Sequence, residues 1–350
     1  MTDAIGLIGL GSVGREMVPH LVKAYGTITI HDRDATRAKA FGNAGGTFAP
    51  SPRAVAAASE IVLLSLPDPD AVRAVLLGSE GLLAEPGRCK LLIDTTTSDP
   101  ATVREMEAAA KARGVTYVEA PISTPLAGQP GPAALKHASA TFLVGAEPAD
   151  FERAKPVLAH LGKYTFHVGA VGQGAAMKLV TNYIAGATRV AIAEGFTLAA
   201  AMGIPCARTA EICRHAAAAS QSLEEVISQA IEGDLNEVNF SIDLRYKDFR
   251  LTGELARELG VPMPMNAYIV ELYQMMRARH GLHGNEQRGA VRGGPCRHRR
   301  LQGRKEEGLA ATGHQQERWP LALAFPFGVR RHLGRRRRPF LQMRERKARV

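Results

Sequence analysis

Three glycines near the start of the chain have a spacing that suits the binding of phosphate. The segment Gly9-Leu10-Gly11-Ser12-Val13-Gly14 reads G-x-G-x-x-G, follows a short apolar run typical of a strand and opens a pattern typical of a helix. In that setting the first glycine permits a tight turn, the second lets a pyrophosphate approach the backbone, and the third lets the helix pack on the strand. Free N–H groups at the start of the helix attract the phosphates. The spacing predicts a dinucleotide-binding loop, with a plain strand-to-helix turn as the alternative.

An acidic residue at the end of the next expected strand bears on the choice of cofactor. Asp32 lies 18 residues after Gly14, where a carboxylate can accept hydrogen bonds from the adenosine ribose and repel a 2′-phosphate. This favours NAD over NADP. Arg33 is a counter-argument, because its guanidinium could hold a 2′-phosphate if Asp32 turned away. Asp32 could instead cap the following helix, a role that Asp34 would fill equally well.

The elements that must position this loop alternate regularly over the first 168 residues, as in βαβ units. Strands are expected at Ala4–Leu10, Thr27–His31, Ile61–Leu66, Leu91–Asp94, Thr116–Glu119, Thr141–Val144 and Tyr164–Val168. Helices are expected between them at Val13–Tyr25, Ala35–Ala44, Ala101–Arg113 and Asp150–Leu161. The continuous apolar run Ile61–Leu64 is typical of a strand that is buried on both faces of a parallel sheet. The pattern predicts an α/β Rossmann-type doubly wound sheet.

After Gly172 the pattern is helical up to about Arg279. Gln173–Met202 predicts one helix of about 30 residues and roughly 45 Å, long enough to link two domains. Further helices are expected at Cys206–Ala218, Leu223–Glu232, Tyr246–Leu259 and Asn266–Arg279. We therefore expect a Rossmann domain over residues 1–168 and an all-α substrate and oligomerisation domain over residues 169–285, joined by a long interdomain helix.

The charge pattern sets the last segment apart. Residues 281–350 carry 18 Lys or Arg and five Glu, a net charge of +13, whereas residues 1–280 carry 26 basic and 29 acidic residues, a net charge of −3. Residues 286–350 lose all periodicity and are rich in Gly, Pro and Arg, so we expect a basic, mostly disordered tail. The abrupt change in composition also suggests the hypothesis of a reading-frame slip, which resequencing of the gene would test.

Composition excludes several classes of protein. Apolar residues make up 45% and charged residues 22% of the chain, which excludes a fibrous or wholly disordered protein. The apolar run Ala4–Leu10 is too short to span a membrane, and we expect a cytoplasmic protein. Cysteines occur at positions 89, 206, 213 and 296 without C-x-x-C or zinc-like spacing, so we expect reduced thiols and no metal site.

Six motifs occur in an order that resembles one enzyme family. They are Gly6–Gly11, Ser65–Pro67, Asp94–Pro100, Ala120–Ser123, Gly172–Asn182 and Lys247-Asp248. Together they resemble the β-hydroxyacid dehydrogenases, such as 3-hydroxyisobutyrate dehydrogenase and tartronate semialdehyde reductase and, more distantly, 6-phosphogluconate dehydrogenase. The resemblance covers roughly Ile5–His280. It implies an NAD(P)-dependent oxidoreductase that transfers a hydride to or from a small 3-hydroxy acid or its semialdehyde and acts as a homodimer or homotetramer.

The resemblance also implies roles for individual residues. Lys178 would be the general acid/base: its ammonium would donate a proton in reduction, and its neutral amine would accept one in oxidation. Only the second role requires the pKa of Lys178 to be lowered from about 10.4, by burial or by cationic neighbours. Asn182, one helical turn further on, would orient the substrate or the lysine. A solvated helix lysine with a surface asparagine is the alternative reading of this pair.

Other residues would bind the cofactor or the substrate. Leu66, Pro67 and Thr97 would lie beside the cofactor, and Lys247 would reach it. Ser123, with Thr124 as a substitute donor, would bind the substrate carboxylate. The family continues this loop with Gly-Gly where this chain has Thr124-Pro125, which removes one N–H donor. Glu194, Arg189, Met275 and Met276 are interpreted as scaffold.

Two other functions remain in competition. An imine reductase of related fold is less favoured, because that group looks different at the position of Lys178. A non-catalytic dinucleotide-binding protein could use its basic tail to hold nucleic acid, and that binding would weaken steeply with salt.

Overall fold

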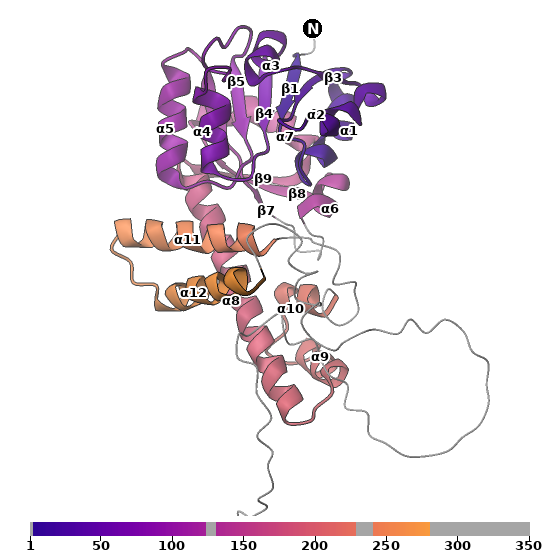
Figure 1. Ribbon diagram of the computed structural model, residues 1–350, viewed down its shortest axis with the longest axis vertical. Helices are drawn as coiled ribbons and strands as arrows, with labels where there is room; N and C mark the ends of the chain where they lie inside the picture. The colour runs from indigo at the N-terminus through magenta and orange to yellow at the C-terminus, as the bar shows by residue number, and fades with distance from the viewer. Residues whose placement is uncertain (1–2, 124–130, 229–240, 281–350) are drawn as a thin grey trace, which may run out of the picture.

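The computed structural model describes residues 3–123, 131–228 and 241–280. An α/β part at one end is joined to a helical part at the other by the long helix α8 (Gln173–Ala201), as Figure 1 shows. Thr124 and the 286–350 segment lie outside the described residues, so the expectations for them stay predictions. The predicted fold class is confirmed.

The described strands form one nine-stranded sheet with the order β3-β2-β1-β4-β5-β6-β8-β7, with β9 paired to β8. Their bounds are β1 Ile5–Ile8, β2 Ile28–His31, β3 Gly46–Phe48, β4 Ile61–Leu64, β5 Leu91–Asp94, β6 Thr116–Glu119, β7 Ile122–Ser123, β8 Ala140–Gly145 and β9 Gly162–Gly169. β1 to β6 run parallel, but β8 runs antiparallel to β6 and β7. The sheet is therefore parallel except where β8 meets β6 and β7.

Helices cover both faces of the sheet. They are α1 (Gly14–Tyr25), α2 (Ala35–Lys39), α3 (Pro52–Ala58), α4 (Pro69–Leu77), α5 (Pro100–Lys111), α6 (Gly131–Lys136) and α7 (Pro148–Ala159). Successive residues of β4 belong in turn to two different apolar clusters, with Leu63 in one and Leu64 in the other. Each buried leucine of this kind contributes about 1.5–3 kcal/mol relative to an exposed one. The run Ile61–Leu64 is apolar because both of its faces are covered.

Three helices begin where a polar residue precedes proline. Ser51, Asp68 and Asp99 are the N-caps of α3, α4 and α5, and each accepts a hydrogen bond from a backbone N–H inside the helix. Proline suits the first helical position, where its missing N–H is no loss. The expected helix Ala35–Ala44 is shorter than predicted: α2 ends at Lys39 and a 3₁₀ turn, η1, follows at Gly42–Ala44.

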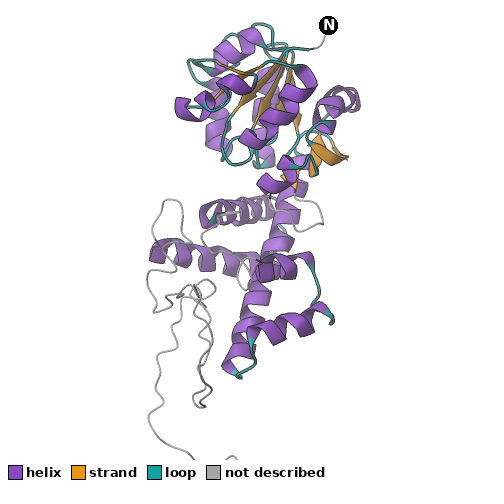
Figure 2. Cartoon of the chain, turned by 90° about the vertical axis from the view of Figure 1, so that its right-hand side faces the viewer, coloured by secondary structure: helices purple, strands orange, loops and turns teal. Residues whose placement is uncertain are grey.

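The helical part consists of helices packed along α8. They are α9 (Cys206–Arg214), α10 (Gln221–Val226), α11 (Ile242–Glu258) and α12 (Pro264–His280), and all four contact α8. Figure 2 shows no strand in this part, which agrees with the assignments over 173–228 and 241–280. A Cβ on Gly186 would lie 2.4 Å from the ring of Phe249. The missing side chain therefore lets α11 approach α8 closely.

Helix α8 exposes much of its apolar surface. In the part of the chain that is described, it is the one helix whose length and composition alone would suffice to cross a membrane, and 11% of its most apolar stretch is buried inside the protein. The helix also carries polar residues that pack against the sheet and against α11, and these form the site described next.

Candidate active site

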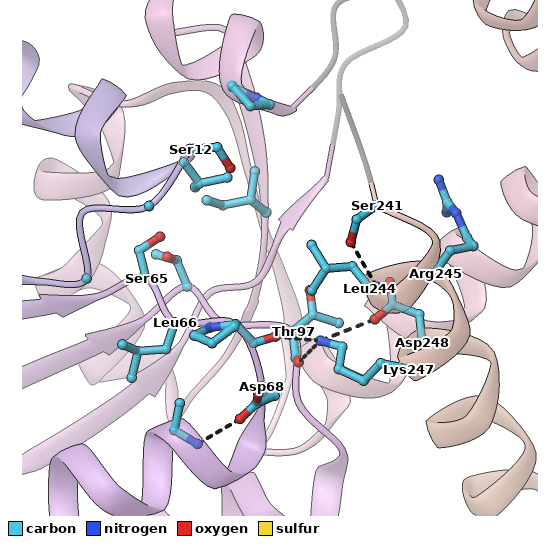
Figure 3. Close-up of a pocket in the computed structure, with 18 of the residues that line it drawn as sticks. Ser12, Ser65, Leu66, Asp68, Thr97, Ser241, Leu244, Arg245, Lys247 and Asp248 are labelled. Atoms are coloured by element: carbon cyan, nitrogen blue, oxygen red, sulfur yellow. Dashed lines mark hydrogen bonds and ion pairs between the residues drawn. The ribbon is translucent and has the colours of Figure 1, made fainter. Parts of the chain in front are cut away.

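A pocket of about 1110 Å³ lies between the sheet and the helices α8 and α11. This volume is slightly above the range of roughly 300–1,000 Å³ that is typical of ligand pockets. In Figure 3, Ser12, Ser65 and Leu66 line one side, and Ser241, Leu244 and Arg245 line the opposite side. The first group follows the carboxyl ends of β1 and β4, which is where doubly wound sheets bind ligands.

The glycine loop has the geometry that a dinucleotide requires. Gly9 has φ +97°, and a Cβ there would lie 2.2 Å from the carbonyl oxygen of Ser65. A Cβ on Gly14 would lie 1.9 Å from the carbonyl oxygen of Gly9, so the loop closes tightly onto α1. A Cβ on Gly11 would meet only Arg37, at 4.0 Å, and Gly11 lines the pocket. The first and third glycines are needed for packing, and the second leaves room for a phosphate group.

Asp32 holds two backbone segments at the far end of the pocket. Its Oδ2 accepts a hydrogen bond from the N–H of Leu10 at 2.7 Å, and its Oδ1 accepts one from Asp34 at 2.8 Å. Asp34, rather than Asp32, is the N-cap of α2, which settles the capping alternative. Arg33 and Arg37 also line this end. A carboxylate oxygen has more than one lone pair, so Asp32 can still accept from a ribose hydroxyl.

Lys247 joins the helical part to two loops of the sheet. Its Nζ donates to the carbonyl oxygen of Thr97 at 2.8 Å and to that of Pro67 at 3.2 Å. Figure 3 shows this side chain extended toward Thr97. Nearby, the hydroxyl of Thr96 accepts from the N–H of Leu66 at 3.1 Å. The four predicted residues Leu66, Pro67, Thr97 and Lys247 all line the pocket.

A hydrogen-bonded chain of three side chains stands beside this group. The Nζ of Lys178 donates to Oδ1 of Asn182 at 2.8 Å, and Nδ2 of Asn182 donates to Oδ2 of Asp248 at 2.6 Å. Lys178 and Asn182 are one turn apart on α8, and Asp248 comes from α11. All three line the pocket. The solvated-lysine reading is wrong, since Lys178 is 7% exposed.

The surroundings of Lys178 ease the loss of its proton. Burial lowers the pKa of Lys178 from 10.5 to about 8; the Asp248 carboxylate acts in the opposite direction, and Arg245, Lys247 and Arg189 add to the lowering. An amine with a pKa near 8 can both donate and accept a proton close to neutral pH.

A buried glutamate fixes the start of α8 one turn before the lysine. Oε1 of Glu119, at the end of β6, accepts from the N–H groups of Gly172 and Gly174, and its Oε2 accepts from Ala175 at 2.9 Å. Burial raises the pKa of Glu119 to about 7 against the effect of these three donors. Because Gly174 precedes Lys178 by one turn of the same helix, this contact sets where the lysine enters the pocket.

Some of the predicted site residues line the pocket, and others do not. Gly9, Gly11, Ser12, Val13, Asp32 and Arg33 line the pocket, whereas Leu10 and Gly14 are buried and do not line it. On β7 the pocket is lined by Ile122 and not by Ser123. Arg189 and Met276, interpreted from the sequence as scaffold, belong to the pocket wall. No group of three or more His, Cys, Asp or Glu suited to a metal occurs in 3–123, 131–228 or 241–280.

Glu119 and Arg245 were missed as site residues. Glu119 precedes the Ala-Pro motif but meets α8 more than 50 residues later. Arg245 gave no signal beyond its position two residues before Lys247. Neither role follows from local spacing: Glu119 meets the start of α8 only where that helix packs on the sheet, and Arg245 lines the pocket only where α11 packs on α8.

The fold and the site define a dinucleotide-dependent oxidoreductase with a helical second domain. Residues 4–169 match the model of the NAD binding domain of 6-phosphogluconate dehydrogenase, and residues 172–292 match that of the NAD-binding of NADP-dependent 3-hydroxyisobutyrate dehydrogenase. The chain belongs to the β-hydroxyacid dehydrogenase family and is an NAD(P)-dependent enzyme of that family.

Individual relatives agree with this assignment. The chain is 32% identical to a 2-(hydroxymethyl)glutarate dehydrogenase from Eubacterium barkeri, over 82% of this chain and 93% of that one. It is 29% identical to a 3-hydroxyisobutyrate dehydrogenase from Pseudomonas aeruginosa, over 79% and 92% respectively. A structure of Mycobacterium tuberculosis 3-hydroxyisobutyrate dehydrogenase with L-serine superposes with a TM-score of 0.70 at 25% identity, over 84% of this chain and all of that chain.

Proposed function

We propose that the protein interconverts a small 3-hydroxy acid and its semialdehyde, with Lys178 as the general acid/base. The observation that carries this proposal is the buried Lys178–Asn182–Asp248 chain in the same pocket as the glycine loop. A base with a pKa near the working pH, close to a cofactor loop, is what the oxidation of an alcohol needs.

The residues of the chain divide the proton chemistry among them. In oxidation the neutral amine of Lys178 accepts the hydroxyl proton, and in reduction its ammonium donates a proton to the carbonyl oxygen. Asn182 accepts a hydrogen bond from Nζ and so holds the amine in one direction without trapping it in an ion pair. Asp248 orients the Asn182 amide by accepting from its Nδ2. Lys247 holds the loops of Pro67 and Thr97 beside this chain.

The cofactor would lie along the glycine loop. The space beside Gly11 and the pocket-lining Ser12 and Val13 fit a pyrophosphate, and the bound nicotinamide supplies the hydride acceptor. We propose NAD as the preferred form, because the Asp32 carboxylate would repel a 2′-phosphate. The exposed Arg33 is the residue that would favour NADP.

The substrate carboxylate would lie toward β7. Ser123 follows the pocket-lining Ile122 and can donate a hydroxyl hydrogen bond. Thr124 remains the substitute donor that the sequence predicts. We propose these catalytic and binding roles together with a division of the chain into a cofactor domain over residues 1–168 and a helical domain over residues 169–285.

We also propose that a second copy of the chain covers α8, giving a homodimer or homotetramer in the cytoplasm. Met177, Val180, Ile184 and Leu198 leave 39%, 44%, 58% and 68% of their surface exposed along this helix, and a large exposed apolar surface marks an interface. Sedimentation should give a dimer or larger for the wild type and a monomer for Ile184→Glu. A monomeric wild type would contradict the proposal.

Turnover of a substrate panel tests the proposed reaction. Short 3-hydroxy acids and semialdehydes are offered with NAD and NADP in both forms, and the absorbance of the reduced nicotinamide is followed. Turnover of at least one hydroxy acid, with a higher kcat/KM for NAD than for NADP, supports the proposal. Cofactor binding with no turnover of any acid would favour the non-catalytic alternative, and turnover of cyclic imines alone would favour an imine reductase.

A further inference from the structure

A carboxylate from the sheet caps the helix that carries Lys178. Glu119 is the last residue of β6 and is 2% exposed. Its side chain accepts hydrogen bonds from the N–H groups of Gly172, of Gly174 at 3.0 Å and of Ala175 at 2.9 Å. The N-cap residue of α8, Gly172, has no side chain with which to cap the helix. The cap therefore comes from a residue that lies 53 positions earlier in the chain.

The cap completes the hydrogen bonding of the first turn of α8. The first N–H groups of a helix lack a partner within the helix, and a buried N–H without a partner is unfavourable. Gln173 donates to the carbonyl oxygen of Ala170 at 3.0 Å. Gly174 and Ala175 are buried and donate to Glu119. Without the carboxylate, these two N–H groups could find a new partner only if the turn moved toward water.

Bare backbone on both sides makes room for the carboxylate. Glu119 and Gly145 are paired across β6 and β8, and a Cβ on Gly145 would lie 1.9 Å from Oε1 of Glu119. A Cβ on Gly174 would lie 2.4 Å from the carbonyl oxygen of Leu143, also on β8. The two glycines thus let the start of α8 lie directly against the sheet, with the Glu119 carboxylate in contact with both.

The Glu119 carboxylate is ionised where the lysine acts as a base. Burial and, to a smaller extent, the neighbouring Asp94 carboxylate raise the pKa of Glu119 to about 7, and the three N–H donors oppose this rise. Lys178 has a pKa of about 8. Glu119 is therefore mostly ionised at the pH at which Lys178 titrates, and the partial positive charge at the start of α8 favours this form.

Glu119 also leads into the loop that is proposed to bind the substrate. Ile122 follows it by three positions and lines the pocket, and Ser123 comes next. On α8, Gly174 precedes Lys178 by one helical turn, and Lys178 lines the same pocket. The contact between Glu119 and α8 therefore ties the substrate loop to the helix that carries the amine.

We propose that Glu119 is a positioning residue that acts through Lys178: its carboxylate fixes how deeply the amine is buried and how the amine lies relative to the loop of Ile122 and Ser123. The inference rests on the proposed function and adds to it a residue that neither donates nor accepts the transferred proton. Loss of the carboxylate should let the first turn of α8 move toward water and expose the amine. A displacement of about 1 Å is enough to lower the rate about a hundredfold.

The pKa of the amine reports its position without any turnover. Lys178 is labelled with acetic anhydride from pH 6 to 11, and mass spectrometry of its peptide gives the midpoint of its reactivity. The wild-type midpoint should lie at about 8. In Glu119→Gln it should rise by about one unit or more toward 10.5, because exposure removes the effect of burial. An unchanged midpoint in Glu119→Gln would overturn the proposal.

Two further variants show whether the contact itself is responsible. Gly145→Ala keeps the charge of Glu119 but places a methyl group against its carboxylate, so the midpoint should rise as in Glu119→Gln; it also serves if Glu119→Gln does not fold. Glu147→Gln is the matched control, because Glu147 is exposed at the N-cap of α7 and its side chain makes no capping hydrogen bond with that helix, which the structure describes in full. Its midpoint should stay at about 8. A rise equal to that in Glu119→Gln would contradict the proposal.

A double-mutant cycle separates this proposal from the proposed reaction. Glu119→Gln should lower kcat for oxidation by about tenfold to a hundredfold in the wild type. In Lys178→Ala it should lower kcat by less than about twofold, because a residue that acts through the amine has no further effect once the amine is absent. Equal falls in the two backgrounds would show a general structural role and overturn the positioning proposal. Wild-type turnover in Lys178→Ala would instead refute the proposed reaction alone, since the labelling experiment still decides whether Glu119 positions the amine.

Discussion

Replacing Asp248 by asparagine should move the pH dependence of oxidation to lower pH. The Asp248 carboxylate favours the charged form of Lys178, whose pKa is about 8, and oxidation needs the neutral amine. Without the carboxylate the amine loses its proton at lower pH, so the rising limb of kcat/KM should shift in the acidic direction. Asparagine is nearly isosteric and can still accept a hydrogen bond from Asn182, so the change acts mainly on charge.

The size of the shift can be worked from the hydrogen-bonded chain. Bonds of 2.8 Å and 2.6 Å joined by one amide place the two charges roughly 7 Å apart, where an effective dielectric constant of about 20 gives about 2 kcal/mol. Since about 1.4 kcal/mol corresponds to one pH unit, the midpoint should fall from about 8 to between about 6 and 7.

The assay is kcat/KM for oxidation of the best acid from the panel, from pH 5.5 to 10 at saturating NAD. Glu254→Gln is the matched control: it removes one negative charge from the same helix at an exposed site paired with Arg250, and its midpoint should stay at about 8. An Asp248→Asn midpoint at or above that of the wild type would refute the proposed role of Lys178 as the base.

Two further substitutions test the cofactor end and the start of α8. Asp32→Asn should raise kcat/KM for NADP relative to NAD at least tenfold, because repulsion of the 2′-phosphate is lost; an unchanged ratio in NADH and NADPH assays, with Asp34→Asn as control, would contradict the preference for NAD. Burial raises the pKa of Glu119 from 4.5 to about 7, so folding takes up a proton between these values, and this contribution to stability is present at low pH and lost as pH rises through 7. The loss amounts to about 3 kcal/mol. Urea unfolding at pH 5 and pH 8 should show this fall in the wild type beyond any fall in Glu119→Gln, and equal falls in both would contradict the raised pKa.

Local spacing was sufficient to predict the elements that carry the cofactor loop. β1 and α1 lie within the segments predicted around Gly9–Gly14, and the long helix predicted from Gln173 to Met202 ends one residue earlier, at Ala201. These elements are long, strongly patterned or bounded by glycine, so tertiary packing has little to change. The start of α9 at Cys206 was also predicted, but the helix ends at Arg214 rather than at Ala218.

Short elements were missed for physical reasons that differ. β3 and β7 have three and two residues, too few to show a period of two. α3 and α4 did carry a signal in Ser51-Pro52 and Asp68-Pro69, a capping residue followed by proline at the first helical position. That signal was overlooked because both helices are short.

The site residues likewise fall into two groups: those whose pairing follows from local spacing and those that only the fold brings together. The spacing of Lys178 and Asn182 follows from one helix, and their pairing needed no knowledge of the fold. Arg189 lies on that same face 11 residues from Lys178, yet it was interpreted as scaffold because nothing in the sequence shows that α10 and α11 leave a cavity there. The contact between Asn182 and Asp248 depends on Gly186, whose missing side chain lets Phe249 pack against α8, and such a contact is visible only in three dimensions.

Lys178→Ala tests the central claim most directly. Turnover and the dissociation constant for NADH are measured for the wild type, for Lys178→Ala and for Lys155→Ala, an exposed lysine that does not line the pocket. Turnover of Lys178→Ala should fall by about 10²- to 10⁴-fold, as for the loss of a general acid/base, while NADH binds within about twofold of the wild type. Retention of wild-type turnover by Lys178→Ala, with NADH binding unchanged, would contradict the assignment of the proton-transfer step to this lysine.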